Sequence, residues 1–249
     1  MPDGGVRLDC DGPVATVTLC RPDVLNAQTP VTWGALRRFS RELPGDVRVV
    51  LVRGEGRAFS AGLDLAVARD TAGELARLPA DGCADAIAGY QEGFTWLRRP
   101  DLVTVAAVQG YAIGAGFQLA LACDLRVLAD DAVFAMAEVT LGLVPDLGGT
   151  KRLVELVGYA RALELCATGR RVSAGEADRL GLANLVVPRA ELDGAARDLC
   201  AALLASPRDA VVEVKALLAG AAARTYADQD SAEREAQTRR LRDLAGLDE

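Results

Sequence analysis

Alternating apolar and polar positions open the chain, and helical spacing follows them. Residues 6–9 and 14–19 carry apolar side chains at alternate positions, and residues 11–13 (Asp-Gly-Pro) between them have the composition of a turn. Residues 31–42 then repeat apolar side chains with helical spacing, and Thr29 is suited to cap the start of that helix. The pattern predicts a β-hairpin followed by a helix.

Two later apolar runs, residues 47–52 and 102–108, have the length of buried strands. Residues 124–128 are expected to form a third strand. The first two lead into glycine-rich loops, at residues 54–62 and 110–116, and helical sequence follows the second loop. Because strands and helices alternate, we expect an α/β protein with a parallel sheet.

The pattern changes at Pro188, beyond which no strand is expected. Helical spacing recurs in three segments: residues 189–204, 208–218 and 227–244. We therefore expect an α/β core in residues 1–188 and a C-terminal helical region, suited to oligomerisation, in residues 189–249.

Composition narrows the chemistry. The 249 residues contain no histidine, which excludes a Ser-His-Asp triad, a Cys-His pair and a histidine-ligated zinc ion. Lys151 and Lys215 are the two lysines of the chain, and neither has a serine three residues before it. Acid–base chemistry is therefore expected from a carboxylate, a cysteine, a tyrosine or a lysine.

Charge and cysteine usage bear on location and partners. The formal net charge is −7 and no basic run occurs, so neither nucleic acid nor an anionic membrane is an expected partner. The six cysteines are far apart, no N-terminal targeting pattern is present, and no apolar run is long enough for a membrane span. These features predict a cytoplasmic protein with reduced thiols.

The glycine-rich loops do not match the known nucleotide-binding patterns. Phe59 and Leu119 stand where a dinucleotide fingerprint needs its third glycine, and no G-x-x-x-x-G-K-[ST] sequence occurs. Small residues at two strand ends would let two backbone N–H groups approach one ligand oxygen, which is the arrangement of an oxyanion hole. From spacing alone, the alternative is that these glycines only form tight turns.

Four segments resemble the crotonase superfamily, also called the enoyl-CoA hydratase/isomerase family. Residues 58–65 (AFSAGLDL) are similar to its first oxyanion segment, and residues 109–119 (QGYAIGAGFQL) to its second. Residues 134–153 resemble its catalytic segment, and residues 21–27 its early signature. The segments occur in the family's order between residues 14 and 187.

The resemblance implies a crotonase-like spiral of β-β-α turns with a C-terminal helical appendage, which in this family usually mediates trimers or hexamers built from two trimers. It also implies an acyl-CoA thioester as substrate. No separate cofactor and no metal are implied, since coenzyme A is part of that substrate. Arg21, Arg53 and Arg57 flank the loops, where they either meet the anionic coenzyme or are simply solvated.

The resemblance also assigns roles to residues of this chain. The thioester oxygen is expected between the backbone N–H groups of Leu63 and Ala115. Residues expected to line the acyl-CoA site are Ala61, Asp64, Leu65, Ala66, Gly114 and Gln118. A buried leucine in the core is the plainer interpretation of Leu63, and the two interpretations are compatible.

The carboxylates indicate the reaction. Hydratases of this family hold a water with two glutamates, at positions matching Gln118 and Glu138, and only Glu138 is a carboxylate here. A single glutamate at that position is the arrangement of enoyl-CoA isomerases, so isomerisation with Glu138 as acid–base residue is the favoured prediction. Asp146 is a second candidate catalytic acid, and its plainer role would be to cap a helix that begins at Leu147.

Three alternatives remain open. The first is an enoyl-CoA hydratase, a lyase, in which one glutamate and a held water are sufficient. The second is a dienoyl-CoA isomerase or dehalogenase that uses Asp146. The third is a catalytically silent acyl-CoA-binding protein. If Glu138 and Asp146 face one apolar pocket, their repulsion should raise one carboxyl pKa.

Overall fold

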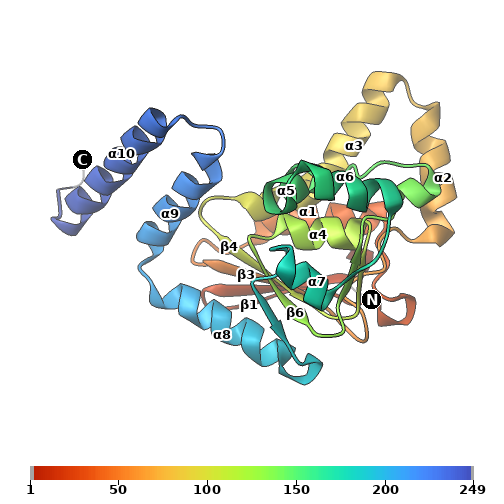
Figure 1. Ribbon diagram of the computed structural model, residues 1–249, viewed down its shortest axis with the longest axis horizontal. Coiled ribbons are helices and arrows are strands. Elements are labelled where there is room, and N and C mark those ends of the chain that lie inside the picture. The colour runs from red at the N-terminus through yellow and green to blue at the C-terminus, as the bar shows by residue number, and fades with distance from the viewer. Residues whose placement is uncertain (1–2, 248–249) are drawn as a thin grey trace.

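The computed structural model describes residues 3–247 and contains two sheets with helices packed around them (Figure 1). The strands are β1 (Val6–Asp11), β2 (Val14–Leu19), β3 (Val49–Gly54), β4 (Val103–Val108), β5 (Tyr111–Ile113), β6 (Leu125–Ala129), β7 (Val133–Ala135), β8 (Val172–Ser173) and β9 (Leu185–Val187). The α-helices are α1 (Pro30–Glu42), α2 (Leu65–Arg77), α3 (Ala80–Thr95), α4 (Ala115–Ala122), α5 (Gly149–Val157), α6 (Tyr159–Thr168), α7 (Ala174–Arg179), α8 (Leu192–Ala205), α9 (Arg208–Ala221) and α10 (Tyr226–Leu244). Short 3-10 turns connect several of them.

The larger sheet has the strand order β1-β2-β3-β4-β6-β9. The β1–β2 hairpin is antiparallel, and β2, β3, β4, β6 and β9 pair in parallel. The predicted hairpin, the predicted first helix and its Thr29 cap are all confirmed, since the Thr29 side chain accepts a hydrogen bond from the Thr32 N–H. The β-branched runs form the parallel strands because such side chains pack well on both faces of a pleated sheet.

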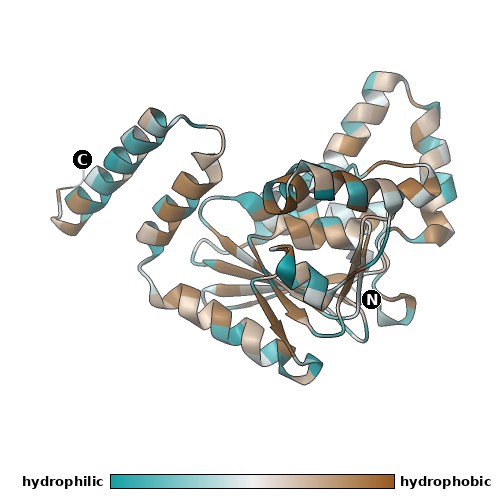
Figure 2. Ribbon diagram, viewed as in Figure 1, coloured by the Kyte–Doolittle hydropathy of each residue, from teal (hydrophilic) through white to brown (hydrophobic). Residues whose placement is uncertain are grey.

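Helices cover the two faces of this sheet, so that each strand is buried on both sides. Val50 and Val52 of β3 point into the main core with α1, α3 and α4, whereas Val49 and Leu51 pack against α8. The strands are accordingly among the most apolar elements in Figure 2. The division predicted at residue 188 stays a prediction, although α8 shares its core with the sheet.

The smaller sheet was not predicted from the sequence. It has the order β5-β7-β8 and is built from strands of two or three residues, which are too short to show a period. Two isolated parallel bridges, Ser60 with Ala112 and Gln28 with Leu63, connect the first glycine-rich loop to β5 and to the segment before α1. The predicted α/β fold with a helical C-terminal region is confirmed.

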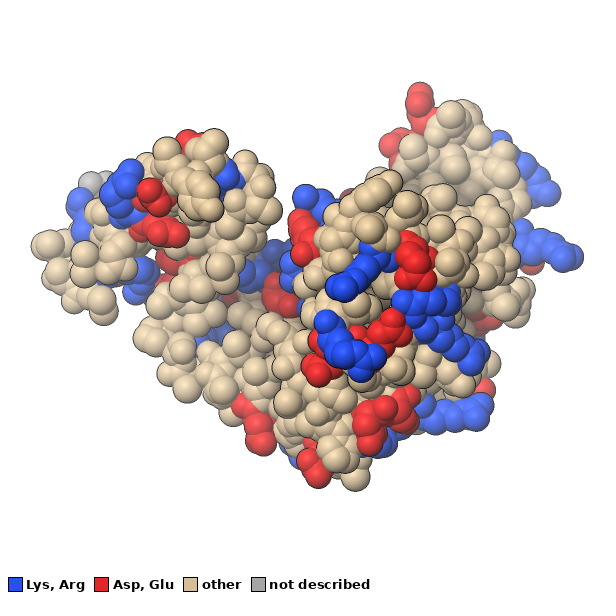
Figure 3. All heavy atoms as spheres, in the orientation of Figure 1, with Lys and Arg blue, Asp and Glu red and all other residues tan. Residues whose placement is uncertain are grey.

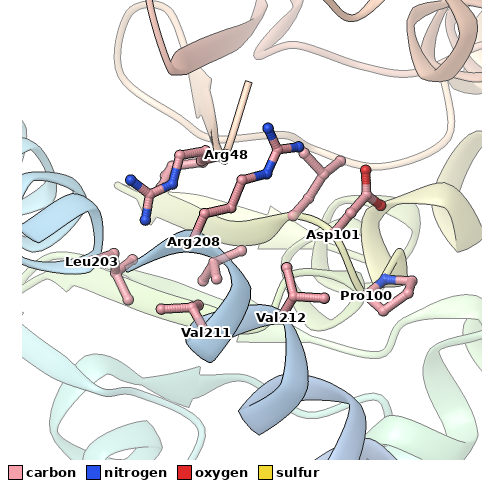
Figure 4. A pocket seen from close by; sticks show the side chains of 10 residues that line it. Arg48, Pro100, Asp101, Leu203, Arg208, Val211 and Val212 are labelled. Atoms are coloured by element: carbon pink, nitrogen blue, oxygen red, sulfur yellow. The ribbon is translucent and has the colours of Figure 1, made fainter. Parts of the chain in front are cut away.

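Helices α9 and α10, together called the C-terminal arm, extend away from the rest of the molecule (Figure 1). Polar contacts fasten the arm: Lys215 Nζ donates to Asp124 Oδ2 (2.7 Å) and to the Leu102 carbonyl oxygen (2.6 Å). At the elbow between α8 and α9, Arg48, Asp101 and Arg208 gather around a cavity of about 10 Å³, which has room for one water at most (Figure 4). No helix within residues 3–247 is both long enough and apolar enough to cross a membrane.

Candidate active site

The segment after η2 (Pro22–Val24) holds the first glycine-rich loop in place. Asn26, which is buried and has a φ of 55°, donates from Nδ2 to the carbonyl oxygens of Glu55 and Ala58, each at 2.8 Å. The Ala61 N–H donates to the Leu25 carbonyl oxygen at 2.8 Å. A side chain that tolerates the left-handed region and can donate twice is therefore needed at position 26.

The two glycine-rich loops lie directly against each other. The Ser60 N–H donates to the Tyr111 carbonyl oxygen (2.8 Å), and the Ile113 N–H donates to the Ser60 carbonyl oxygen (3.0 Å). A Cβ added to Gly62 would lie 2.4 Å from the Ile113 oxygen, and one added to Gly116 would lie 2.6 Å from the Ser60 oxygen. Both glycines are therefore required by close backbone approach, and Gly62 also has a φ of 88°.

The backbone N–H groups of Leu63 and Ala115 are available as donors. Gln28 bonds to the carbonyl of Gly62 and to the N–H of Asp64, so the N–H of Leu63 between them points away from that segment. Ala115 begins α4, whose amino-terminal N–H groups carry partial positive charge. The position of a Cβ on Gly62 is 3.5 Å from the Ala115 nitrogen, which shows how close the two loops come.

Glu138 lies beside these donors, at the start of η4 (Glu138–Leu141). Its Oε1 would be 3.2 Å from a Cβ on Gly114, the residue before Ala115, and it accepts a hydrogen bond from Gln118 Nε2 at 2.7 Å. Its Oε2 is buried and has no hydrogen-bond partner within residues 3–247. Burial raises the pKa of Glu138, a hydrogen bond from its own backbone and the hydrogen bond from Gln118 oppose this increase, and the Asp146 charge adds a smaller rise.

Asp146 precedes α5 but does not cap it. The helix starts at Gly149 with Gly148 in the cap position and no side-chain cap, so the predicted helix start at Leu147 and the cap by Asp146 are wrong. Gly148 has a φ of 88°, which delays the helix by two residues. Burial raises the pKa of the Asp146 carboxyl, and the Asp146 charge makes a small contribution that raises the pKa of Glu138.

Other predicted site residues surround the two glycine-rich loops in different ways. Asp64 caps α2 by accepting from the Ala66 N–H (3.1 Å) and pairs with Arg21 Nη2 at 2.9 Å. Leu65 is 67% exposed beside the loop, and Ala66 is exposed as well. Asp64 therefore shapes the loop, while Leu65 and Ala66 present their side chains to solvent at its rim.

The three arginines near the loops differ in their surroundings. Arg21 pairs with Asp64, and Arg53 lies on the α8 side of the sheet, where it pairs with Asp193. Arg57 is exposed, and in the part of the chain from residue 3 to residue 247 its side chain has no ion pair. Lysine and arginine are interspersed with acidic residues over the face in Figure 3, so an anionic ligand would meet local cations rather than a basic surface.

A sequence profile of one protein family matches nearly the whole chain. Residues 9–244 match the sequence profile described as enoyl-CoA hydratase/isomerase. The chain belongs to the enoyl-CoA hydratase/isomerase family. The resemblance found in the sequence is thus confirmed, as is the coarser prediction of an acyl-CoA enzyme of the hydratase/isomerase type.

Relatives within the enoyl-CoA hydratase/isomerase family carry related activities. The chain is 40% identical over 213 residues to carnitinyl-CoA dehydratase from Salmonella enteritidis PT4, an alignment that covers 84% of this chain and 78% of the relative. A candidate enoyl-CoA hydratase from Thermobifida fusca YX, solved with CoA, is 49% identical with a TM-score of 0.92, covering 98% of this chain and 95% of that one. Its structure with acetoacetyl-CoA is 50% identical with a TM-score of 0.91, covering 96% of each chain.

Some positioning residues were not singled out from the sequence. Gln28 donates from Nε2 to Ser60 Oγ (3.0 Å) and accepts from Trp33 Nε1 (2.9 Å), while Ser60 Oγ donates to the Asn26 carbonyl oxygen (2.8 Å). Their signal is the segment LNAQ at residues 25–28, which places two amide side chains between the predicted hairpin and the predicted first helix. Buried polar groups in such a network must all be paired, which explains why they lie together.

Proposed function

We propose that this chain is an enoyl-CoA isomerase in which Glu138 moves one proton between the α and γ carbons of the acyl group. Glu138 takes the α proton of a 3-enoyl thioester, the electrons move to the thioester oxygen, and the proton returns to the γ carbon as the double bond shifts. The observation that carries the proposal is that one oxygen of Glu138 has no hydrogen-bond partner within residues 3–247, while the neighbouring position 118 holds an amide. An amide cannot exchange a proton as the second glutamate of a hydratase would.

The enolate oxygen would lie between the N–H groups of Leu63 and Ala115. Negative charge develops on that oxygen in the transition state, and one preorganised donor is worth about 2.7–4 kcal/mol there. The donors belong to the backbone and are held by the contact between the two loops, so they need no reorganisation during the reaction. Residues Ala61, Asp64, Leu65, Ala66 and Gly114 would form the walls along which the acyl-CoA lies.

A second candidate is hydration, or the reverse dehydration, with Glu138 and Asp146 as the two acids. Its support is the carnitinyl-CoA dehydratase relative, together with the effect of the Asp146 charge on the Glu138 pKa. Two carboxyls in one environment can divide the roles of proton donor and acceptor at neutral pH. Dienoyl-CoA isomerisation or dehalogenation through Asp146 would use the same pair.

Mass spectrometry in deuterated water tests these proposals directly. The purified protein is incubated with 2-enoyl-, 3-enoyl- and 2,4-dienoyl-CoA thioesters, and Glu138→Gln and Asp146→Asn serve as comparison variants. Deuterium uptake with a shifted double bond, lost in Glu138→Gln and retained in Asp146→Asn, is the expected result. Gain of one water that needs both carboxyls would establish the second candidate, and binding without any turnover would indicate the silent acyl-CoA-binding protein.

The proposed enzyme needs no cofactor beyond the coenzyme A of its substrate, and we place it in the cytoplasm. The C-terminal arm carries apolar side chains on its outside, including Leu218 (71% exposed) and Leu244 (80% exposed). Such residues are typical of a surface that another copy covers. We therefore propose a homotrimer or a hexamer of two trimers, to be tested by sedimentation velocity.

A further inference from the structure

Gln118 holds two parts of the candidate site at once. Its Oε1 accepts from the Leu147 N–H (2.9 Å) and the Gly149 N–H (3.2 Å), while its Nε2 donates to Glu138 Oε1 at 2.7 Å. We propose that Gln118 is a positioning residue, which ties Glu138 Oε1 so that proton transfer passes through Oε2 alone. This inference rests on the proposed function, because it assigns the reacting oxygen of the same glutamate.

The direction of the Gln118 amide follows from its partners. The N–H groups of Leu147 and Gly149 are donors and need an acceptor. The Gln118 amide oxygen must therefore face α5, and its NH2 group must face Glu138. Glu138 Oε1 is therefore an acceptor in either protonation state. A proton carried by Glu138 must then reside on Oε2, the oxygen without a partner within residues 3–247.

Packing prevents Gln118 from turning away. The side chain is 1% exposed in the middle of α4, and a Cβ on Gly149 would lie only 2.8 Å from its Cγ. Both acceptor positions of its oxygen are used, which leaves one N–H as its remaining hydrogen-bonding capacity. Gln118 can thus hold Glu138, but it has no free acceptor with which to hold a reacting water.

A second glutamine holds the loop before α5, and within residues 3–247 it forms no hydrogen bond with Glu138. Gln91 of α3 donates from Nε2 to the Asp146 backbone oxygen at 2.7 Å. Loss of either glutamine removes support from the loop that contains Asp146 and Leu147. Only loss of Gln118 also releases the carboxyl of Glu138, which makes Gln91 a matched control.

The pH dependence of kcat/KM separates these roles. Glu138 must be ionised to accept the α proton, so activity falls as the pH drops through its pKa. In Gln118→Leu the hydrogen bond that favours the ionised form is lost, and we expect kcat/KM to fall about 10- to 100-fold with the acid limb moved to higher pH. In Gln118→Glu the N–H groups of Leu147 and Gly149 keep an acceptor. Two carboxyl oxygens now face each other and share a proton, so the acid limb of the pH profile also moves to higher pH.

Gln91→Leu completes the set and is expected to keep the acid limb of the wild-type enzyme. A wild-type pH profile in Gln118→Glu would overturn the proposal, because that variant keeps the loop bonds and changes only the group that faces Glu138. An equal shift of the limb in Gln91→Leu would overturn it too, since loop support alone would then explain the effect.

A second readout does not depend on having the right substrate. The pKa of Glu138 is followed by NMR of protein containing glutamate labelled with carbon-13 at the carboxyl, with the signal assigned by its loss in Glu138→Gln. The pKa should rise in Gln118→Leu and stay unchanged in Gln91→Leu. If no enoyl-CoA is turned over, the proposed function fails while this titration still decides the positioning role, and an unchanged Glu138 pKa in Gln118→Leu overturns that role.

Discussion

The core around the glycine-rich loops and the C-terminal arm are held by different forces. In the core, the rings of Phe117 and Phe134 stack at 4.4 Å and are almost entirely buried. In the arm, Lys215 makes the attachment through two directed hydrogen bonds, and Tyr226 is 94% exposed. The comparison shows that apolar burial forms the core behind the site, whereas directed polar contacts help to attach the arm, in which Leu218 and Tyr226 are largely exposed.

The largest effect is expected from a cavity in the core. Phe117→Ala removes a fully buried ring that stacks on Phe134, and it should lower the free energy of unfolding by about 3–5 kcal/mol. Urea denaturation followed by circular dichroism measures this change. Leu218→Ala in the arm is the control, and a similar loss there would contradict the distinction between the two regions.

Lys215→Met should have an intermediate effect, confined to the arm. The change removes the donor to Asp124 Oδ2 and to the Leu102 oxygen, for an expected loss of about 1–3 kcal/mol. Hydrogen exchange should quicken in α9 while the core stays protected. Lys151→Met is the matched control, because the Lys151 side chain is 81% exposed and pairs with Glu155 on the surface. Faster exchange throughout the core of Lys215→Met would show that the arm supports the site after all.

Glu138→Gln should abolish turnover and yet stabilise the fold. Because burial raises the Glu138 pKa, the stability associated with its protonated form is present below the ordinary carboxyl pKa and is lost as the pH rises through the higher folded-state value. The neutral variant avoids that loss, so its unfolding free energy at neutral pH should increase by about 0.5–2 kcal/mol. Thermal unfolding at pH 4 and pH 8 checks the sign: the gain should be larger at pH 8, and a larger gain at pH 4 would contradict it.

The smallest effect is expected at the outer surface of the arm. Tyr226→Ser should change the unfolding free energy of the monomer by no more than about 0.5 kcal/mol, since the ring is exposed. Dilute samples monitored by chemical denaturation give this value. If the proposed oligomer covers Tyr226, the same variant should weaken self-association in sedimentation velocity, so a stable trimer in the variant would place the contact elsewhere on the arm.

Elements with a clear period could be predicted from the sequence. The β1–β2 hairpin, α1 with its Thr29 cap, the parallel strands and the C-terminal helices all have the spacing of the structure that they form. Strands β5, β7 and β8 could not be predicted, because two or three residues do not make a pattern. The start of α5 was also missed, since the left-handed Gly148 displaces it from Leu147.

The sequence by itself determined the family, the α/β architecture and the absence of histidine chemistry, because these depend on residue types, order and period. Only the tertiary structure decided that Gln118 faces Glu138 and α5 together, that Asp146 leaves the helix uncapped, and that one Glu138 oxygen has no partner among residues 3–247. The physical reason is that hydrogen bonds and pKa shifts arise between groups far apart in the chain, whose approach depends on how the backbone packs.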